Sequence, residues 1–225
     1  MFFNLNHKLY IAMIGDIVQS KELENRKECQ DKLMTVLDSI NKKYTESIAS
    51  KFMITLGDEF QGLLKNGADT MRIISDIEIK MFPVKIRFGI GIGRITTDIN
   101  SDIPLGADGP AYYNARKMVE LIKKTEKKNK TTDINIMIAS EDNQSTDILL
   151  NTILTLSSAI KNKWTDRQRE IVFDCIEHGD NQVRAAERLG IGQSSVQKSL
   201  SNTDYYSYKK AMDTIADALA EIKVV

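Results

Sequence analysis

Along the first two thirds of the chain, hydrophobic residues alternate between short apolar runs and stretches with helical spacing. The short runs predict β-strands at 9–14, 52–56, 60–64, 84–93 and 134–139. Apolar residues spaced to share one helix face predict amphipathic helices at 21–43, 68–79 and 109–124. The first six elements follow the order βαββαβ, which predicts the split βαβ arrangement of a ferredoxin-like α+β sheet.

The last third of the chain has a purely helical pattern. Helices are predicted at 147–160, from 165 onward, and at 181–189, 193–200 and 205–222. Thr165 and Gln168 have the spacing of a capping box. The short helices on either side of the Gly-Ile-Gly turn at 190–192 have the signature of a helix-turn-helix.

These patterns divide the chain into three parts. We expect an α+β domain over 1–145, a linker helix within 146–162, and a small all-α helix-turn-helix domain over 163–225. The final helix, 205–222, is expected to cap the helix-turn-helix core. A dimer helix is the alternative.

An acidic pair stands between two apolar runs in the stretch LGDEFQGLL, where Gly57-Asp58 predicts a hairpin turn. In the predicted sheet, Asp58 lies at the same edge as Asp16, which ends the first strand. Two adjacent carboxylates repel each other unless a cation neutralises them, and Mg²⁺ suits such a pair. The alternative is that Asp58 serves only the turn and Asp16 caps a helix.

Two further features are compatible with a bound nucleotide. Backbone N–H groups at the start of the first helix, together with Ser20 and Lys21, could hold a polyphosphate. Gly89, Gly91 and Gly93 lie on one face of a strand, which indicates either the floor of a ligand site or close packing against another backbone.

Four stretches together resemble a known enzyme class. IGDIVQSK and LGDEFQG are similar to the metal-binding stretches of class III nucleotidyl cyclases, and the second also resembles the diguanylate cyclase signature. VKIRFGIGIG and ADGPAYYNARKM resemble the strand and helix that follow in class III enzymes. A cyclase-like domain followed by a helix-turn-helix resembles the layout of the SatD family of bacterial proteins.

The resemblance implies specific roles for several residues. Asp16, the Ile17 carbonyl and Asp58 match the positions that bind two Mg²⁺ ions, which would activate a nucleoside triphosphate.

The sequence also departs from the cyclase pattern. Ile54 stands where cyclases have the lysine that recognises the base. Asn114 and Arg116 are two residues apart and cannot share a helix face, as the matching cyclase residues do. Arg116 and Lys117 remain candidates for a catalytic contact with phosphate.

The helix-turn-helix motif places its second helix in the major groove of DNA. The residues expected to read bases are Gln193, Ser194, Ser195 and Gln197. Those expected to contact phosphates are Lys198, Arg184 and Arg188. From 161 to 225 the chain has ten basic and ten acidic residues, so binding by one copy should be weak and sensitive to salt. The alternative is a helical bundle used for dimerisation or docking.

Overall composition adds few constraints. Basic and acidic residues number 31 each, so the formal net charge gives no general affinity for nucleic acid. The two cysteines are far apart and indicate neither a disulfide framework nor a zinc site. The N-terminal stretch has no apolar run typical of a signal peptide or membrane span, so we expect a cytoplasmic protein without membrane contact.

The sequence therefore favours a bacterial DNA-binding regulator with a domain that binds a nucleotide or metal. A homodimer is compatible with this interpretation. One alternative is an active Mg²⁺-dependent nucleotidyl cyclase or nucleotidyltransferase that uses the helix-turn-helix for targeting or dimerisation. Another is a protein-interaction module built on an inactive catalytic fold.

Overall fold

The computed structural model describes residues 8–20, 25–129, 134–179 and 181–222. Its strands are β1 (Tyr10–Ile17), β2 (Ile48–Leu56), β3 (Glu59–Leu64), β4 (Ile86–Gly93) and β5 (Ile136–Ser140). The first helices are α1 (Arg26–Lys43), α2 (Thr70–Met81), α3 (Pro110–Asn129) and α4 (Gln144–Lys161). The C-terminal helices are α5 (Asp166–His178), α6 (Gln182–Leu189), α7 (Gln193–Asn202) and α8 (Tyr205–Ala220). The predicted α+β class and the predicted order of elements are confirmed.

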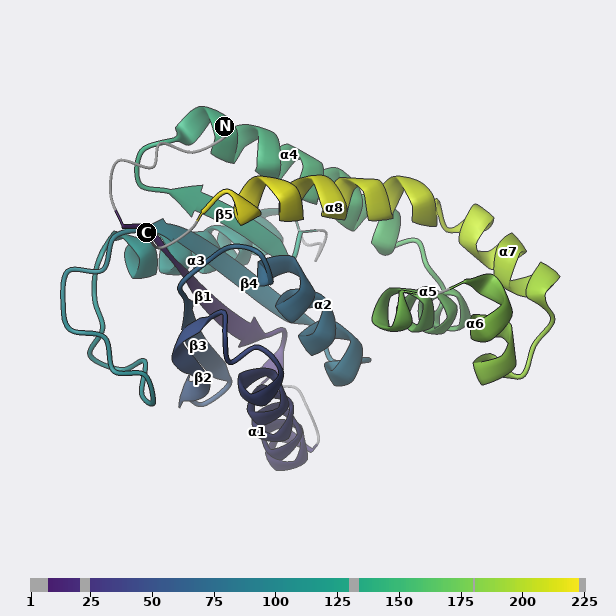
Figure 1. Cartoon of the computed structure of the whole chain (residues 1–225), viewed down its shortest axis with the longest axis horizontal. Helices are drawn as coiled ribbons and strands as arrows, with labels where there is room; N and C mark the ends of the chain where they lie inside the picture. The colour runs from purple at the N-terminus through teal and green to yellow at the C-terminus, as the bar shows by residue number, and fades with distance from the viewer. Residues whose placement is uncertain (1–7, 21–24, 130–133, 180, 223–225) are drawn as a thin grey trace.

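The strands form one five-stranded sheet in the order β2-β3-β1-β4-β5 (Figure 1). Strand β1 lies at the centre, antiparallel to both β3 and β4, whereas β5 runs parallel to β4. Because helices cover both faces of the sheet at β1, its sequence is an almost continuous apolar run, and all but its first residue are buried.

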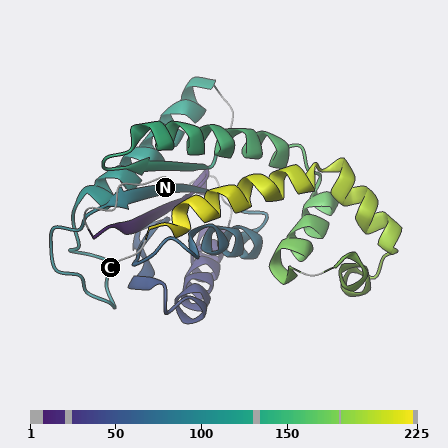
Figure 2. The ribbon, with the colours of Figure 1, turned by 45° about the horizontal axis from the view of Figure 1, so that its top comes forward.

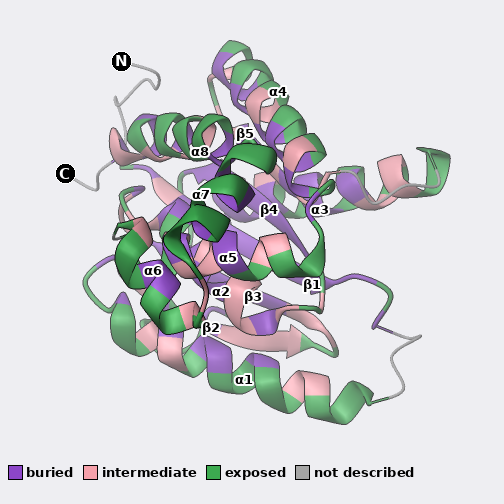
Figure 3. Cartoon of the chain, turned by 90° about the vertical axis from the view of Figure 1, so that its right-hand side faces the viewer, coloured by how far each residue is buried: buried purple, intermediate pink, exposed green. Residues whose placement is uncertain are grey.

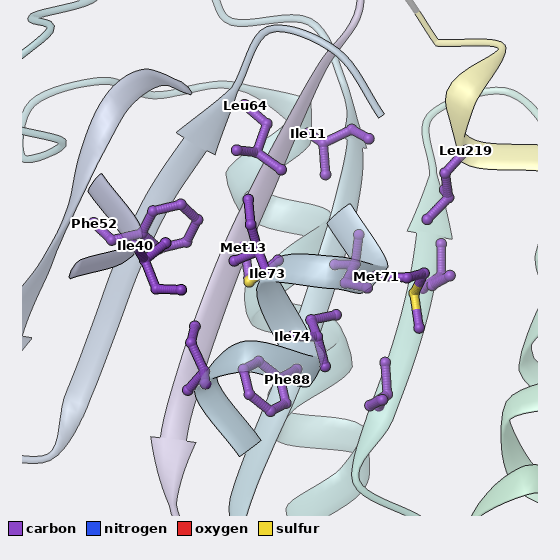
Figure 4. Packing of buried hydrophobic residues seen from close by; sticks show 14 of the residues in the cluster. Ile11, Met13, Ile40, Phe52, Leu64, Met71, Ile73, Ile74, Phe88 and Leu219 are labelled. Atoms are coloured by element: carbon purple, nitrogen blue, oxygen red, sulfur yellow. The ribbon is translucent and has the colours of Figure 1, made fainter. Parts of the chain in front are cut away.

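Helices cover both faces of the sheet. One face of β1, with Ile11 and Met13, packs against α1 and α2 in the main core (Figure 4). The opposite face, with Ala12 and Ile14, packs against α3. Helix α4 packs against the edge strand β5, and α8 lies along α4 (Figure 2).

The face of β4 that carries Gly89, Gly91 and Gly93 packs closely against α3. A Cβ atom on Gly89 would lie 2.1 Å from the Ala115 carbonyl oxygen, and one on Gly91 would lie 1.9 Å from the Ala111 carbonyl oxygen. Gly93 meets the first turn of α3 in the same way. The glycines therefore allow the backbone of α3 to approach β4 closely. Of the two interpretations of this glycine face, close packing applies and a ligand floor does not.

The C-terminal helices form a second, smaller core. Helix α5 begins with the predicted capping box, in which both the Thr165 and the Gln168 side chains accept hydrogen bonds from the backbone. Helix α6 ends at Gly190, whose φ of 62° is the left-handed conformation that glycine adopts without strain. The small core contains Trp164, Ile171, Val172, Cys175, Ala185, Ala186, Val196, Leu200, Tyr205 and Tyr208.

Helix α8 belongs to both cores, which the sequence did not predict. Its first turns place Tyr208 in the small core, but Ile215 and Leu219 lie in the main core. A Cβ atom on Gly67 would lie 1.8 Å from the Leu219 carbonyl oxygen, and the Gly67 N–H donates to the Ile222 carbonyl at 3.0 Å. The domain division at 163 stays a prediction, and the second half of α8 packs on the α+β core.

Other differences concern the ends of elements. Strand β2 begins at Ile48, four residues before the prediction, and α3 extends to Asn129. Among the residues that the structure describes, no helix combines the length and apolarity needed to cross a bilayer.

Candidate functional site

The candidate site centres on Asp16, at the end of β1 on the sheet face covered by α3. Asp16 is 5% exposed. Arg87 lies directly opposite it in the β1–β4 register, and its Nη1 donates to Asp16 Oδ2 at 2.7 Å. The other carboxylate oxygen, Oδ1, lies 3.0 Å from Nζ of Lys123 on α3. Both oxygens of Asp16 are therefore bonded to cationic side chains.

A second carboxylate completes this cluster. Glu126 of α3 accepts from Arg87 Nε at 2.8 Å and lies 2.6 Å from its Nη2. Burial opposes the charge of Arg87, but hydrogen bonds to Glu126 and Asp16 and the charges of both outweigh it and raise the pKa of the guanidinium. Two carboxylates and two cations leave the cluster electrically neutral.

The hairpin between β2 and β3 presents its two acidic residues differently. Glu59 pairs with Asp16 in the β1–β3 register and accepts two hydrogen bonds from Arg116 of α3, at 2.8 and 3.0 Å. Asp58 is in the turn, and its backbone carbonyl accepts from the Ile17 N–H at 3.4 Å. Burial raises the pKa of the Cys29 thiol on α1; the Lys32 charge opposes that rise, and the Asp58 charge adds a smaller one.

The arrangement around Asp16 does not fit a divalent ion. The Arg87 guanidinium bonds both the Asp16 carboxylate and, at 3.4 Å, the Ile17 carbonyl, two of the three groups expected to hold metal. Mg²⁺ requires ligand oxygens that are free for it in near-octahedral geometry. Among the described residues, no group of three or more His, Cys, Asp or Glu side chains could hold an ion. The metal set of Asp16, Ile17 and Asp58 therefore stays a prediction, and Arg87 counts against it.

Arg116 and Lys117 line a pocket of about 440 Å³ between α3, the sheet and the loop before α3. Gln61 and Ile14 of the sheet line it too. Tyr112 also lines the pocket, and its buried hydroxyl has no hydrogen-bond partner among the described residues.

Asn114 lies on a different side of α3 from Arg116. Its side-chain amide donates to the Ile92 carbonyl at 3.2 Å, whereas Arg116 reaches the β2–β3 hairpin. Asn114 and Arg116 therefore do not share a helix face, which agrees with the prediction made from their two-residue spacing.

The predicted phosphate-binding pair is only partly described. Ser20 is buried, at 7% exposed, and Lys21 lies outside the described residues. Ser20 is not among the described residues that line the pocket beside Arg116 and Lys117.

In the small domain, α6, a three-residue turn and α7 follow in succession. The predicted base-reading residues Gln193, Ser194, Ser195 and Gln197 are all exposed, as is Lys198. Buried Val196 and Leu200 hold the other side of α7 against the bundle. Arg184 is exposed on α6, but Arg188 is paired with Asp174 of α5 through contacts of 2.7 and 3.0 Å.

The family model described as "SatD family" matches residues 10–219 of this chain. The chain belongs to the SatD family. This confirms the family resemblance drawn from the order of its motifs. A search of curated proteins found no match.

Solved structures similar to this SatD-family chain include nucleotide cyclases. A bacterial light-regulated adenylyl cyclase is 14% identical, with a TM-score of 0.44, over 58% of this chain and 74% of the cyclase. A dimeric guanylyl cyclase domain of the RhoGC fusion protein, from the aquatic fungus Blastocladiella emersonii, is 17% identical, with a TM-score of 0.38, over 50% of this chain and 74% of that domain.

The sequence did not identify Arg87 and Lys123 as members of the site. A signal was present, because Arg87 follows the alternation of the glycine face of β4 and must face the same helix as Gly89. Lys123 and Glu126 are neighbours on one face of α3, three residues apart.

Proposed function

We propose that this SatD-family protein binds DNA through a helix-turn-helix formed by α6 and α7. The observation that carries the proposal is the two-sided character of α7. Gln193, Ser194, Ser195, Gln197 and Lys198 are exposed, whereas buried Val196 and Leu200 fix the helix to the bundle. A recognition helix needs such a free polar side to enter the major groove.

The residues on that side have the chemistry for base recognition. Gln193 is at the first turn of α7, where recognition helices contact base edges, and glutamine can pair with adenine through two hydrogen bonds. Lys198 and Arg184 are exposed, and in this proposal they contact phosphates. Arg188 is instead assigned to orienting α6 on α5, since Asp174 already neutralises it.

For the first domain we propose a ferredoxin-like, cyclase-like fold that regulates DNA binding and takes a nucleotide without turning it over. The order β2-β3-β1-β4 with antiparallel neighbours supports the ferredoxin-like assignment. The pocket beside Arg116 and Lys117 offers a place for the ligand, although Asp108 and Glu120 also line it and balance its two cations. A DNA-binding role would place the protein in the cytoplasm.

The second candidate is an active Mg²⁺-dependent nucleotidyl cyclase or nucleotidyltransferase. The order of its motifs and the Arg116–Lys117 pocket favour it. It requires Arg87 and Lys123 to release Asp16 when nucleotide and metal bind. The neutral, buried arrangement of that cluster opposes such a release.

Fluorescence polarisation with duplex DNA at low salt tests the DNA proposal. The Lys198→Ala substitution should weaken binding to all sequences and lower the slope of log affinity against log salt by about one. Gln193→Ala should mainly reduce discrimination between a selected site and random DNA. Lys27→Ala, an exposed lysine on α1, is the matched control. Binding that is indifferent to both α7 substitutions would overturn the assignment.

Incubation of the pure protein with each nucleoside triphosphate and Mg²⁺ or Mn²⁺ tests the enzyme candidate. A product that disappears in the Asp58→Ala variant would establish turnover and refute a purely regulatory first domain. No product from any nucleotide would remove the cyclase candidate. Either result leaves the DNA titration independent.

A further inference from the structure

Helix α4 has an apolar side that nothing in the described structure covers. Its inner side places Leu150 and Leu154 in the main core. On its outer side, Ile148, Leu149 and Leu156 are 67%, 63% and 62% exposed. Figure 3 shows exposed residues along the outer turns of α4, which continue towards the second domain. Large aliphatic side chains grouped in this way on a soluble protein mark an interaction surface.

The outer side of α4 also lacks charge. Between Gln144 and Ile160 the one charged residue is Asp147, which is buried. The hydroxyls of Thr152 and Thr155 donate to carbonyl oxygens within the helix, at 2.8 and 2.7 Å, so they need no solvent partner.

The adjacent helix α8 is different in this respect. Its solvent-facing residues include Lys209, Lys210, Asp213 and Asp217. The uncharged side is therefore particular to α4.

Exposed residues on this side recur every seven residues, in one small set, one large set and the mixed pair Ile148 and Thr155. Ser145, Thr152 and Ala159 are small, exposed and seven residues apart. Leu149 and Leu156 are large and separated by the same interval. A seven-residue repeat is the period at which two helices pack against each other continuously, with large side chains entering gaps over small ones.

We propose that the outer side of α4 binds α4 of a second copy of this chain. A second copy supplies large residues for the gaps over Ser145, Thr152 and Ala159, and it brings no charge into an uncharged surface. A two-fold axis requires a surface to be complementary to itself, which this repeat provides. The proposal does not depend on DNA or nucleotide binding.

The dimer is weak and dissociates on dilution. Helix α4 has 18 residues and is about 27 Å long, and one helix face of that length covers less than the roughly 800 Å² per partner of a standard stable interface. Association should therefore depend on protein concentration in the micromolar range or above.

Sedimentation velocity of the full chain without DNA, from about 1 to about 300 µM, tests the proposal. The sedimentation coefficient of the wild-type protein should rise with concentration towards that of a dimer. The Leu149→Glu/Leu156→Glu variant should remain monomeric over the range, a loss of at least about tenfold in affinity. Met34→Glu, which places the same charge at a 53% exposed methionine of α1, should dimerise like the wild type. Thermal melting establishes that the variants are folded.

A cross-linking experiment fixes the geometry. Thr152 lies at the middle of α4, so Thr152→Cys in a Cys29→Ser background should form an intermolecular disulfide on mild oxidation. Leu121→Cys, an exposed position on α3, should not. A wild-type chain that stays monomeric at every concentration, or a dimer unaffected by the two glutamates, would overturn the proposal.

Discussion

Replacing Arg87 with methionine tests the architecture of the candidate site. Arg87 joins Asp16 and Glu126, and the side chains of all three are between 7% and 12% exposed. Methionine retains much of the length and apolar surface of the arginine side chain while removing its charge and its donors. The change therefore isolates the ionic contribution of Arg87 from its packing.

The expected loss follows from the two carboxylates left behind. Removing one partner of a buried ion pair costs about 3–5 kcal/mol, because the other charge stays buried without compensation. Asp16 retains Lys123, whose side chain is 39% exposed, so Glu126 is the carboxylate that loses most. We therefore expect a loss near the lower end of the range, about 3 kcal/mol. Adding Glu126→Gln should restore about 1–2 kcal/mol, because a neutral amide is cheaper to bury than an unpaired charge.

Urea unfolding at pH 7 measures both variants, provided that the slope against denaturant is unchanged. For slopes of about 2–3 kcal/mol per molar, the Arg87→Met midpoint should fall by about 1 M or more. A loss below about 1 kcal/mol would show that the cluster is hydrated and contributes as little as a surface pair. Equal stability of the single and double variants would also contradict the reasoning.

Four further predictions follow from other parts of the structure. Gly91→Ala should cost about 1–3 kcal/mol in thermal unfolding, because its Cβ would overlap the α3 backbone; a variant as stable as the wild type would contradict that close packing. Leu219→Ala should cost about 2–5 kcal/mol and destabilise the α+β domain in urea unfolding, although the residue is close to the C-terminal end; an effect confined to α5–α7 would contradict the shared helix. Without nucleotide, the wild-type protein should leave the electron paramagnetic resonance signal of free Mn²⁺ unchanged, because cationic side chains already bond Asp16; a loss of signal would reverse that conclusion. Burial raises the pKa of Tyr44 to about 12 from an unfolded value near 10. The contribution of this shift to the free energy of unfolding is therefore complete below pH 10 and is lost as the pH rises towards 12. Tyr44→Phe should make that alkaline loss of stability less steep in unfolding measurements at about pH 9 and 11.

Much of the fold could be predicted because the spacing of the apolar residues distinguishes strands from helices. Strand β1 and the hairpin were recognisable, since buried strands and a Gly-Asp turn have local signals. The shared role of α8 was not recognisable. Tyr208, Ile215 and Leu219 would have the same helical spacing if they packed in one core or in two. Only the tertiary structure shows that Tyr208 packs in the small core and the other two in the main core.

The candidate site was predictable only where a motif marked it. Asp16 and Asp58 stand in recognisable stretches, but the partner of Asp16 depends on the register of β1 against β4. That register brings Arg87 opposite Asp16, and α3 then adds Lys123. The alternation along β4 and the helical spacing of α3 indicate which faces carry Arg87 and Lys123, but only the strand register and the packing of α3 bring the two side chains to Asp16. These contacts decide whether the carboxylate is free for metal.

The link between the domains determines how a ligand in the first domain could affect α7. Trp164 donates to the Thr203 carbonyl at 2.8 Å, and Thr203 and Asp204 alone separate α7 from α8. The far end of α8 is fixed by Leu219 in the main core, so a displacement of that core would be carried along α8 to α7. A second contact, between Lys161 and Glu78 at 2.7 Å, ties the end of α4 to α2. If nucleotide changes the affinity for DNA, Lys161→Met should alter the size of that change more than it alters the affinity for nucleotide alone or for DNA alone. The reason is that the substitution removes the contact between α4 and α2 without changing a residue of the pocket or of α7.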